Sequence, residues 1–593
     1  TYIKNIIMEQ MFYTVERSQQ IVISLLKQYG IRKIITSPGT TNITFVASVQ
    51  HDSWFELYSS VDERSAAYMA CGMAAESGEP VVLTCTGATA SRNYVPGLTE
   101  AYYRKLPVLA ITATQDERRI GHLVPQVIDR SNLQNDIAVC SEHIRACFDR
   151  DDEWDATIRA NRAIQSLWYR GGGPVHINLQ TTYSRDFSVK ELPKALKIPR
   201  YTFGDKLPAI EGKVGIFLGA HTIFTPQLTE LVDKFCTKYG AIVFCDHTSN
   251  YQGAFRAMFA LIGTQSIHRC NVGTMDLLIH MGEVSGNYAG SISACKEVWR
   301  LSSDGELRDK VHKLTAVFEM SDEDFFERYT HDYDGVIATT NSWMEQYETE
   351  YDLLYNVIPE LPFSNIWMAQ HTIGKLPKNS FLHLGILNSL RSWNLFDCHS
   401  SIYGSSNTGG FGIDGILSTV LGASLVHPKQ LHFCVIGDLA FFYDLNAVAN
   451  RHVASNIRIL MVNNGKGTEF RIYNHPGNAF GEEADEFIAA AGHYGNKSHK
   501  LVRHYAEDLG FEYLTASNKE EYLRVMERFI NPELTDCPML FEVFTKSEDE
   551  SQALYEINHL TPNKEDVIKM KMKEISEKVL SEKVVNSLKK IIK

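Results

Sequence analysis

The sequence predicts an α/β protein made of three doubly wound, parallel-sheet domains followed by a C-terminal helical tail. Its 593 residues exceed what a single hydrophobic core accommodates. Helical and strand patterns alternate along the chain, and the strand segments are continuous apolar runs. Such runs are typical of parallel strands that helices cover on both faces of the sheet.

The first domain is expected over residues 10–187. An amphipathic helix and a short strand open it, the acidic pair Asp62-Glu63 precedes a second helix, and two buried strands follow. These elements are predicted at 18–29, 33–36, 65–76, 80–85 and 106–112. Their order is that of a doubly wound fold.

Two polar stretches separate the remaining domains. Residues 188–205 are rich in proline and lysine and residues 330–361 are acidic, so both are expected to be connectors. The central domain is predicted over 206–330 and the third domain over 362–548. Their clearest strands are 213–218, 241–245 and 276–281 in the central domain, and 431–436 and 457–462 in the third. No short-period repeat is present, but the first and third domains share a similar size and pattern.

The tail, residues 561–593, is predicted to form a lysine-rich helix. Thr561 would cap this helix, with Pro562 at its first position. Apolar residues then recur at helical spacing, at Ile568, Met572, Ile575 and Val579. A helix of this kind could bind a membrane surface, dock on the protein or contact a partner subunit, and the sequence leaves all three open.

Charge and cysteine content narrow the range of functions. The net charge of −13 gives no basic field for nucleic acid or an anionic membrane, so an anionic substrate would need a local cationic pocket. The eleven cysteines show no CxxC pair or Cys/His ligand spacing, which favours buried thiols over disulfides or zinc. No apolar run has transmembrane length and no signal-like segment opens the chain. We expect a cytoplasmic protein without a membrane span.

The strongest chemical signal joins two turns in the third domain. Gly437-Asp438 follows one buried strand, and Asn463-Asn464 ends the next. Asp438 and Asn464 are 26 positions apart, which places both at the carboxyl edge of the sheet, where ligands bind in open α/β folds. Carboxylate, amide and carbonyl oxygens suit Mg²⁺. Either dipeptide alone is a common turn, but together they favour a metal site.

This segment resembles the Gly-Asp-Gly…Asn-Asn signature of thiamine-diphosphate enzymes. Leu439 stands in place of the usual second glycine, a replacement that one branch of the family tolerates. The resemblance implies that Asp438, Asn464 and the carbonyl of Lys466 hold Mg²⁺ on the diphosphate. The cofactor-binding residues that it implies in this segment are Gly437, Leu439 and Ala440.

A second segment, residues 61–67, resembles the family's strand–glutamate–helix motif. It implies that Glu63 hydrogen-bonds the aminopyrimidine N1′ and so starts the deprotonation of the thiazolium carbon. A carboxyl shielded from water shares a proton readily. The alternative is that Asp62-Glu63 is an acid pair favoured by the helix dipole.

Two further regions match cofactor contacts of the family. Thr86-Gly87 lies in a stretch of small residues that would approach the pyrimidine ring closely. Ile413, in the stretch 406–415, is the candidate for the apolar wedge that bends the cofactor, although a core isoleucine is an equally good interpretation. Gln126 matches an active-site glutamine of the family. His122, in the same loop, is a candidate proton shuttle or simply a solvated histidine.

The resemblance covers residues 13–544 and is closest to the menaquinone-pathway branch, whose synthase joins a 2-oxoglutarate-derived group to isochorismate. Matching stretches are 37–39, 62–66, 388–390, 412–415 and 437–439. That branch grips substrate carboxylates with arginines, which make bidentate bonds. The matching positions here hold Thr41, Trp393 and Thr408, and only the nearby Arg391 offers a replacement. Three lost contacts would cost roughly 1.5–3 kcal/mol each.

We therefore expect a thiamine-diphosphate- and Mg²⁺-dependent decarboxylase or carboligase with a changed substrate. It would decarboxylate a pyruvate-like 2-oxo acid and pass the carbanion to an acceptor or a proton. The family geometry implies a homodimer or a dimer of dimers. The alternatives are the menaquinone-pathway synthase itself, an acetolactate-synthase-like enzyme with FAD, and a non-catalytic cofactor-binding protein. A simple NAD-binding protein is disfavoured because Gly215 and Gly219 form no GxGxxG motif.

Overall fold

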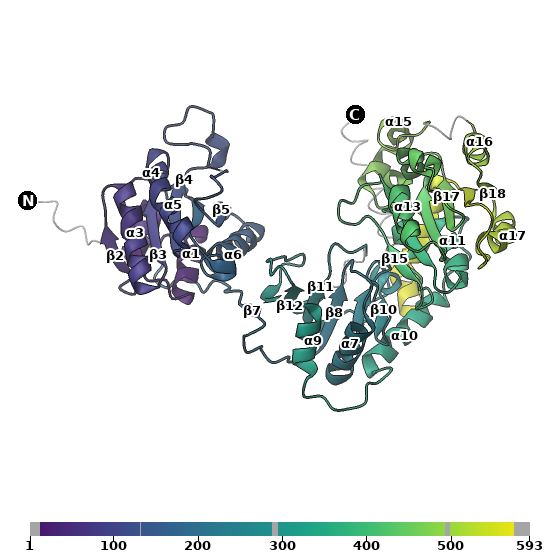
Figure 1. Cartoon of the computed structure of the whole chain (residues 1–593), viewed down its shortest axis with the longest axis horizontal. Helices are drawn as coiled ribbons and strands as arrows, with labels where there is room; N and C mark the ends of the chain where they lie inside the picture. Colours follow the sequence, from purple (N-terminus) through teal and green to yellow (C-terminus); the bar gives the residue numbers. More distant parts are fainter. Residues whose placement is uncertain (1–11, 131, 287–293, 493–497, 574–593) are drawn as a thin grey trace, which may run out of the picture. The chain divides into compact units, whose positions relative to one another are not determined.

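The computed structural model describes residues 12–130, 132–286, 294–492 and 498–573. The chain divides into two compact units (Figure 1). The first unit contains Thr1–Pro199 and Leu307–Thr315, and the second contains Arg200–Glu306 and Ala316–Lys593.

The first unit is built on a six-stranded sheet with the order β2-β1-β3-β4-β6-β5, and all its strand pairs are parallel. The strands are β1 (Lys33–Thr36), β2 (Glu56–Ser59), β3 (Val81–Cys85), β4 (Val108–Thr114), β5 (Cys140–Ile144) and β6 (Val175–Gln180). The main helices are α1 (Arg17–Gln28), α2 (Ile43–Gln50), α3 (Glu63–Ser77), α4 (Thr89–Asn93), α5 (Val95–Arg104) and α6 (Arg150–Gln165).

Helices cover both faces of this sheet, which explains the continuous apolar strands. Ile34 and Val82 belong to a core with α1 and α6. Their neighbours Ile35 and Leu83 belong to a second core with α3 and α5. Since successive strand residues point to opposite faces, each face needs its own apolar set. The predicted doubly wound α/β fold class is confirmed.

The central sheet of the second unit has seven strands in the order β10-β9-β8-β11-β12-β13-β7. The strands are β7 (Arg200–Thr202), β8 (Val214–Leu218), β9 (Val243–Cys245), β10 (Arg256–Met258), β11 (Met275–Met281), β12 (Cys295–Ser302) and β13 (Leu314–Glu319). The helices of this region are α7 (Pro226–Tyr239), α8 (Ala260–Gly263), α9 (Asp322–Thr330) and α10 (Ser342–Tyr355).

The third sheet has six strands in the order β15-β14-β16-β17-β19-β18. The strands are β14 (Phe381–Leu384), β15 (Tyr403–Ser405), β16 (His432–Gly437), β17 (Ile457–Asn463), β18 (Glu512–Ala516) and β19 (Met539–Phe544). The helices are α11 (Asn365–Thr372), α12 (Asn388–Trp393), α13 (Ile416–Val426), α14 (Asp438–Tyr443), α15 (Ala484–Phe487), α16 (Leu501–Asp508), α17 (Lys519–Phe529) and α18 (Ser547–Asn558).

The first and third sheets have the same topology. In both, the strands run in the order second, first, third, fourth, sixth and fifth along the chain. The direction of winding reverses between the first and third strands, and ligands of open α/β sheets bind at the carboxyl edge beside such a reversal. The topology therefore marks the ends of β1 and β3, and of β14 and β16, as candidate sites.

Both stretches that were expected to be connectors contain regular structure. The stretch 188–205 ends in β7, which pairs with β13 at the edge of the central sheet. The stretch 330–361 contains α10, whose N-cap Asn341 accepts hydrogen bonds from the backbone N–H groups of Trp343 (3.0 Å) and Met344 (2.8 Å). The acidic composition of this stretch led to the prediction of a connector, although α10 has a buried face that includes Trp343 and Tyr347.

The tail begins its helix two residues later than predicted. Asn563, rather than Thr561, caps it by accepting a hydrogen bond from the Asp566 backbone N–H (3.0 Å), and residues 564–573 are helical. Ile568 and Met572 are exposed, whereas Ile575 and Val579 lie outside the described residues. None of the described helices is long and apolar enough to cross a membrane.

A polar contact docks the first turn of this helix on the central region. The side chain of Asp566 is buried, and the His268 imidazole bridges its carboxylate (2.6 Å) and that of Glu350. Gln265 continues the contact by accepting a hydrogen bond from the Leu560 backbone N–H (3.2 Å). The described part of the tail therefore meets the protein through polar groups and leaves Ile568 and Met572 exposed.

An Asp566→Ala variant should loosen this helix. Loss of a buried charged hydrogen bond costs about 1–3 kcal/mol, so local opening should increase roughly 5- to 150-fold. The measurement is the rate of limited trypsin cleavage after Lys569 and Lys571. Glu565→Ala removes the same charge from an exposed neighbour and should leave this rate unchanged. Equal rates in the two variants would contradict the docking role of Asp566.

Candidate cofactor and metal site

A cavity of ≈ 140 Å³ lies at the carboxyl edge of β14, β16 and β17. Seven residues that the sequence analysis singled out line it: Ile413, Gly437, Asp438, Leu439, Ala440, Asn464 and Lys466. Residues that the sequence analysis did not name as site residues also line it, among them Asn365, Leu387, Asn388, Glu469 and Phe470. The cavity thus gathers residues from five segments at the place that the sheet topology marks.

Asp438 connects the two turns that form this edge. It is the first residue of α14, and its carboxylate accepts hydrogen bonds from the backbone N–H groups of Leu439 (2.9 Å) and Gly465 (2.7 Å). Burial raises the pKa of Asp438 to about 7, against the opposing effect of these two bonds. No ion pair within the described residues balances this carboxylate, so the position favours a bound cation.

Asn464 and Lys466 supply the other predicted oxygen ligands. The Asn464 side-chain oxygen is buried and has no hydrogen-bond partner among the residues that the structure describes. The Lys466 carbonyl accepts only the Thr468 backbone N–H (2.8 Å), and its ammonium group turns to Asp485 (2.8 Å). A buried acceptor without a donor is costly, and a hard cation would satisfy it. This carboxylate, amide and carbonyl fit Mg²⁺, which would complete its coordination with diphosphate and water.

Ile413 satisfies both interpretations of its role. It packs against the core that contains Phe441 and Leu417, and it also lines the cavity. Left-handed backbone at Phe411 (φ 53°) and Gly415 (φ 81°) turns the loop on either side of it. The side chain is therefore held from behind by the core, as a rigid wedge against a ligand would be.

In the first unit, the acidic neighbours Asp62 and Glu63 have different structural roles. Asp62 is the N-cap of α3, and its side chain accepts a hydrogen bond from the Ser65 backbone N–H (2.7 Å). Glu63 is the first helical residue, is half-buried, and makes no hydrogen bond or ion pair within the described residues. The capping interpretation therefore applies to Asp62 and leaves the Glu63 carboxylate for another partner.

The Thr86-Gly87 loop after β3 packs closely against neighbouring segments of the first unit. The hydroxyl groups of Thr41 and Thr86 are 2.5 Å apart, and the Thr41 oxygen accepts a hydrogen bond from the Gly87 N–H (3.3 Å). A Cβ atom on Gly87 would lie 3.2 Å from the carbonyl oxygens of Ala113 and Gln126. The loop therefore leaves little room for a side chain here, and Gln126 lies against it.

Gln126 and His122 differ in their relation to this loop. Gln126 has left-handed backbone (φ 63°) and an exposed side chain. Strained backbone of this kind is frequent at functional sites. His122 is exposed, and its only described bond is from its backbone N–H to the Arg119 carbonyl (3.2 Å). The structure thus places Gln126, and not His122, beside the candidate pyrimidine loop.

Comparison with known proteins agrees with this arrangement. Residues 17–134 match the family model described as "Thiamine pyrophosphate enzyme, N-terminal TPP binding domain". The chain is similar to 2-succinyl-5-enolpyruvyl-6-hydroxy-3-cyclohexene-1-carboxylate synthases. The one from Phocaeicola vulgatus is 28% identical, with 92% of this chain and 98% of the relative covered. The one from Desulfotalea psychrophila is 27% identical, with 87% and 96% covered.

Residues 17–134 thus match the N-terminal domain of thiamine-diphosphate-dependent enzymes, and the chain resembles members of that superfamily. Its similarity to the menaquinone-pathway synthases extends over nearly its whole length.

The three positions that lack the expected arginines present no cation in this chain. Thr41 is buried beneath the Thr86-Gly87 loop, and Thr408 is also buried. The Trp393 indole is buried and donates a hydrogen bond to the Asn365 side-chain oxygen (2.9 Å). These side chains serve internal packing and hydrogen bonding.

Arg391, the possible replacement, is already paired. Its guanidinium group makes two bonds to the Glu469 carboxylate, at 2.8 and 2.6 Å, and both side chains are largely buried. Glu469 lines the cavity. A carboxylate of the protein therefore occupies the guanidinium edge that a substrate carboxylate would use.

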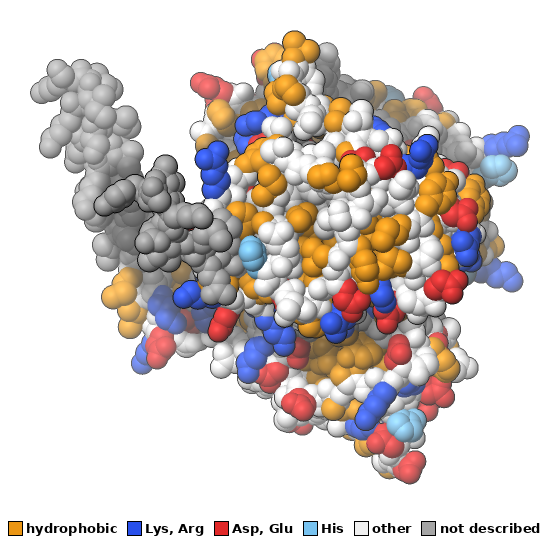
Figure 2. All heavy atoms as spheres, turned by 90° about the vertical axis from the view of Figure 1, so that its left-hand side faces the viewer, with side chains coloured by type: hydrophobic (Ala, Val, Ile, Leu, Met, Phe, Trp, Pro, Cys, Tyr) orange, Lys and Arg blue, Asp and Glu red, His pale blue; other side chains and the backbone are white. Residues whose placement is uncertain are grey.

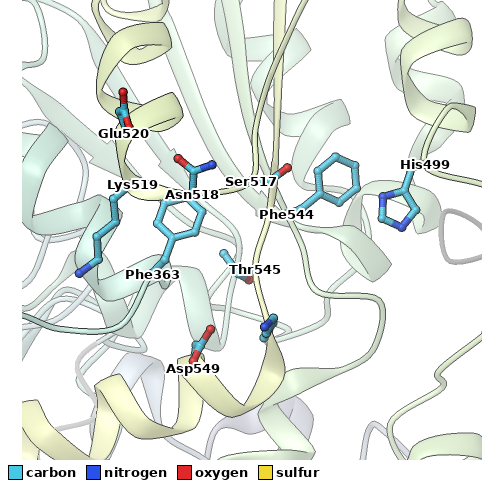
Figure 3. A pocket seen from close by; sticks show the side chains of 10 residues that line it. Phe363, His499, Ser517, Asn518, Lys519, Glu520, Phe544, Thr545 and Asp549 are labelled. Carbon is cyan, nitrogen blue, oxygen red and sulfur yellow. The ribbon is translucent and has the colours of Figure 1, made fainter.

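A larger cavity, of ≈ 600 Å³, lies beyond β18 and β19 and contains none of the predicted site residues (Figure 3). Lys519 and Lys546 line it together with Glu520 and Asp549, so the charges are mixed. The His499 ring stacks on Phe544, with centroids 4.7 Å apart. Size alone does not make this cavity the reaction site, because it offers neither a metal-ligand set nor an unpaired buried polar group.

An Asp438→Asn variant should separate cofactor binding from folding. The amide removes the buried charge but keeps only one of the two accepting oxygens, so the melting temperature without ligands should fall by a few degrees at most. Removal of a charged metal ligand should weaken Mg²⁺-dependent binding of thiamine diphosphate at least about tenfold. Thermal shift and calorimetry measure the two effects.

Asp444→Asn is the matched control. Asp444 accepts hydrogen bonds from the Ser418 backbone N–H (2.6 Å) and hydroxyl (2.7 Å) and does not line the cavity. Its replacement should lower the melting temperature and keep cofactor affinity. The reverse pattern in the two variants would remove Asp438 from the metal site.

Proposed function

We propose that this protein decarboxylates a 2-oxo acid and joins the resulting carbon to an acceptor, using thiamine diphosphate and Mg²⁺. The observation that carries the proposal is the cavity at β16 and β17, where Asp438, the unpaired Asn464 oxygen and the Lys466 carbonyl meet. When bound, thiamine diphosphate supplies the carbon nucleophile and electron sink that such a reaction needs.

The residues of the chain would divide the work as follows. Asp438, Asn464 and the Lys466 carbonyl would hold the metal ion and, through it, the diphosphate. Glu63 would hold a proton at the pyrimidine nitrogen, which its lack of an internal partner permits. Ile413 would fix the bend between the two halves, and Gln126 would offer a polar group beside the Gly87 loop.

A second copy of the chain is part of this proposal. Exposed apolar side chains lie near Glu63 in the sequence: Leu57 and Tyr58 on the exposed strand β2, Val61, and Tyr68 and Met69 on α3. Figure 2 views the first unit from the side of β2 and shows hydrophobic side chains among charged ones on this face. Exposed apolar clusters mark interaction surfaces. We expect a homodimer, or a dimer of dimers, to cover this face.

Two donors are supported by different observations. The similarity over nearly the whole chain favours the activity named for the relatives, 2-succinyl-5-enolpyruvyl-6-hydroxy-3-cyclohexene-1-carboxylate synthase. The buried Thr41, Trp393 and Thr408 and the paired Arg391 favour a donor without a second carboxylate, such as pyruvate. The comparisons thus favour the synthase, which is the alternative, whereas these four side chains are the reason for proposing a pyruvate-like donor.

A panel of donors tests the function directly. Purified protein with Mg²⁺ and thiamine diphosphate should release CO₂ faster from pyruvate or 2-oxobutyrate than from 2-oxoglutarate. The same assay with isochorismate tests the alternative, which replaces our proposal if 2-oxoglutarate then turns over best. Glu63→Gln should lower the rate about 10²- to 10⁴-fold while cofactor binding stays within a few-fold. A Glu63→Gln enzyme of normal rate would refute the mechanism.

The pairing of Arg391 makes a separate prediction about specificity. In Glu469→Gln the guanidinium loses its internal carboxylate, so kcat/KM for 2-oxoglutarate relative to pyruvate should rise about tenfold or more. The double variant Arg391→Gln, Glu469→Gln removes the cation as well and should show no such gain. A similar gain in both variants would mean that cavity size, and not charge, sets the preference.

A further inference from the structure

Arg130 is a buried arginine of the first unit that lacks a balancing charge. Only 5% of the residue is exposed. Its Nη2 atom donates a hydrogen bond to the Ala113 carbonyl (3.1 Å), near the end of β4. The Nε and Nη1 atoms are buried and have no hydrogen-bond partner, and no ion pair within the described residues includes this side chain.

Its position is beside the candidate pyrimidine loop. A Cβ atom on Gly87 would lie 3.6 Å from Nη2 of Arg130 and 3.2 Å from the carbonyl oxygen of Gln126. The guanidinium therefore lies at the carboxyl edge of β3 and β4, the edge that the sheet topology marks for a ligand. Burial, together with the neighbouring Arg92, lowers the pKa of Arg130 to about 10.

Other buried arginines of the chain show how such a charge is usually satisfied. Arg391 is paired with Glu469 by two hydrogen bonds. Arg458 donates hydrogen bonds to three backbone carbonyls, of Phe529, Asn531 and Glu533, at 2.5–2.7 Å. Arg130 has a single acceptor. An unpaired buried charge is strongly destabilising, so its retention points to a ligand that pairs with it.

The chemistry of that ligand follows from the guanidinium. Its N–H groups match a carboxylate, which supplies both the missing acceptors and the missing charge. The carboxylate that leaves as CO₂ is a poor candidate, because an ion pair there would stabilise the group that must depart. A carboxylate on the acceptor carries no such penalty.

We propose that Arg130 determines specificity by binding a carboxylate of the acceptor substrate. This inference rests on the proposed function, because it assumes that an acceptor enters the site near Gly87 and Gln126. Arg130 thereby supplies the local cation that an acidic protein needs to hold an anionic substrate. The donor would bind where no arginine is available for a second carboxylate, whereas the acceptor carboxylate would bind to Arg130.

The test compares two acceptors of similar length, 4-oxobutanoate and butanal, with pyruvate as donor. Arg130→Gln should raise KM for 4-oxobutanoate about 10- to 100-fold and leave KM for butanal within about threefold. CO₂ release from pyruvate without an acceptor should also stay within about threefold. Arg130→Lys keeps the charge without the planar fork and should fall between Arg130→Gln and the wild type.

Arg92→Gln is the matched control, because Arg92 is an exposed cation that donates a hydrogen bond to the Asp129 carbonyl (3.0 Å). It should leave both KM values unchanged. The proposal is overturned if Arg130→Gln affects both acceptors equally, if Arg92→Gln has the same effect as Arg130→Gln, or if donor-only CO₂ release is what Arg130→Gln impairs. In the last case the carboxylate belongs to the donor.

A binding measurement separates this proposal from the proposed function. Succinate, an unreactive dicarboxylate, should raise the melting temperature of the wild-type protein with cofactor and Mg²⁺, and it should not raise that of Arg130→Gln. If no 2-oxo acid is decarboxylated but the succinate effect depends on Arg130, the proposed reaction fails and the anion site stands. If the wild type shows neither the succinate effect nor a preference for 4-oxobutanoate, Arg130 has no such role.

Discussion

The hydrogen bond from the Gly465 backbone N–H to the Asp438 carboxylate (2.7 Å) joins the two turns on which the candidate metal site depends. One turn follows β16 and the other follows β17, and the two strands pair in parallel up to Gly437 and Val462. Parallel pairing puts both strand ends at one edge, so residues distant in sequence meet there without a dedicated loop. The Gly465 N–H donates to Asp438 and so does not donate to the Asn464 side chain. The Asn464 oxygen therefore stays available to a metal ion.

Much of the fold and part of the site could be predicted from the sequence. Continuous apolar strands identify covered parallel sheets, and the sheet edge then brings Asp438 and Asn464 together. The sequence could not show which residue of Asp62-Glu63 caps α3, because capping depends on the extended backbone of Asp62 (φ −89°, ψ 121°). Nor could it show that Trp393 is internal or that Arg130 is buried without a partner, because both depend on tertiary packing. Acidic composition concealed α10 for the same reason.

Identical topology in the first and third sheets places different chemistry at equivalent positions. The turn after the third strand holds Thr86-Gly87 in the first domain and Asp438 in the third. Glycine lets a backbone approach its neighbours within 3.2 Å of where a Cβ would stand, whereas a buried aspartate favours a cation. One architecture thus suits a flat, weakly polar ring at one edge and a charged diphosphate at the other. This division is what a cofactor with two dissimilar ends requires.

Buried carboxyl groups lie at the cavity and behind the residues that line it. Burial raises the pKa of Glu542 and raises that of Glu550 to about 7, as it does for Asp438. Glu550 accepts hydrogen bonds from the Asn365 backbone N–H and the Asn388 amide, both from cavity-lining residues, so it fixes their orientation. With Arg391 paired to Glu469, the side chains at this edge leave a metal ion as the natural counter-charge. An anionic group remote from the metal then needs a cation elsewhere, and among the described residues Arg130 is a buried arginine with two unpartnered nitrogen atoms, Nε and Nη1.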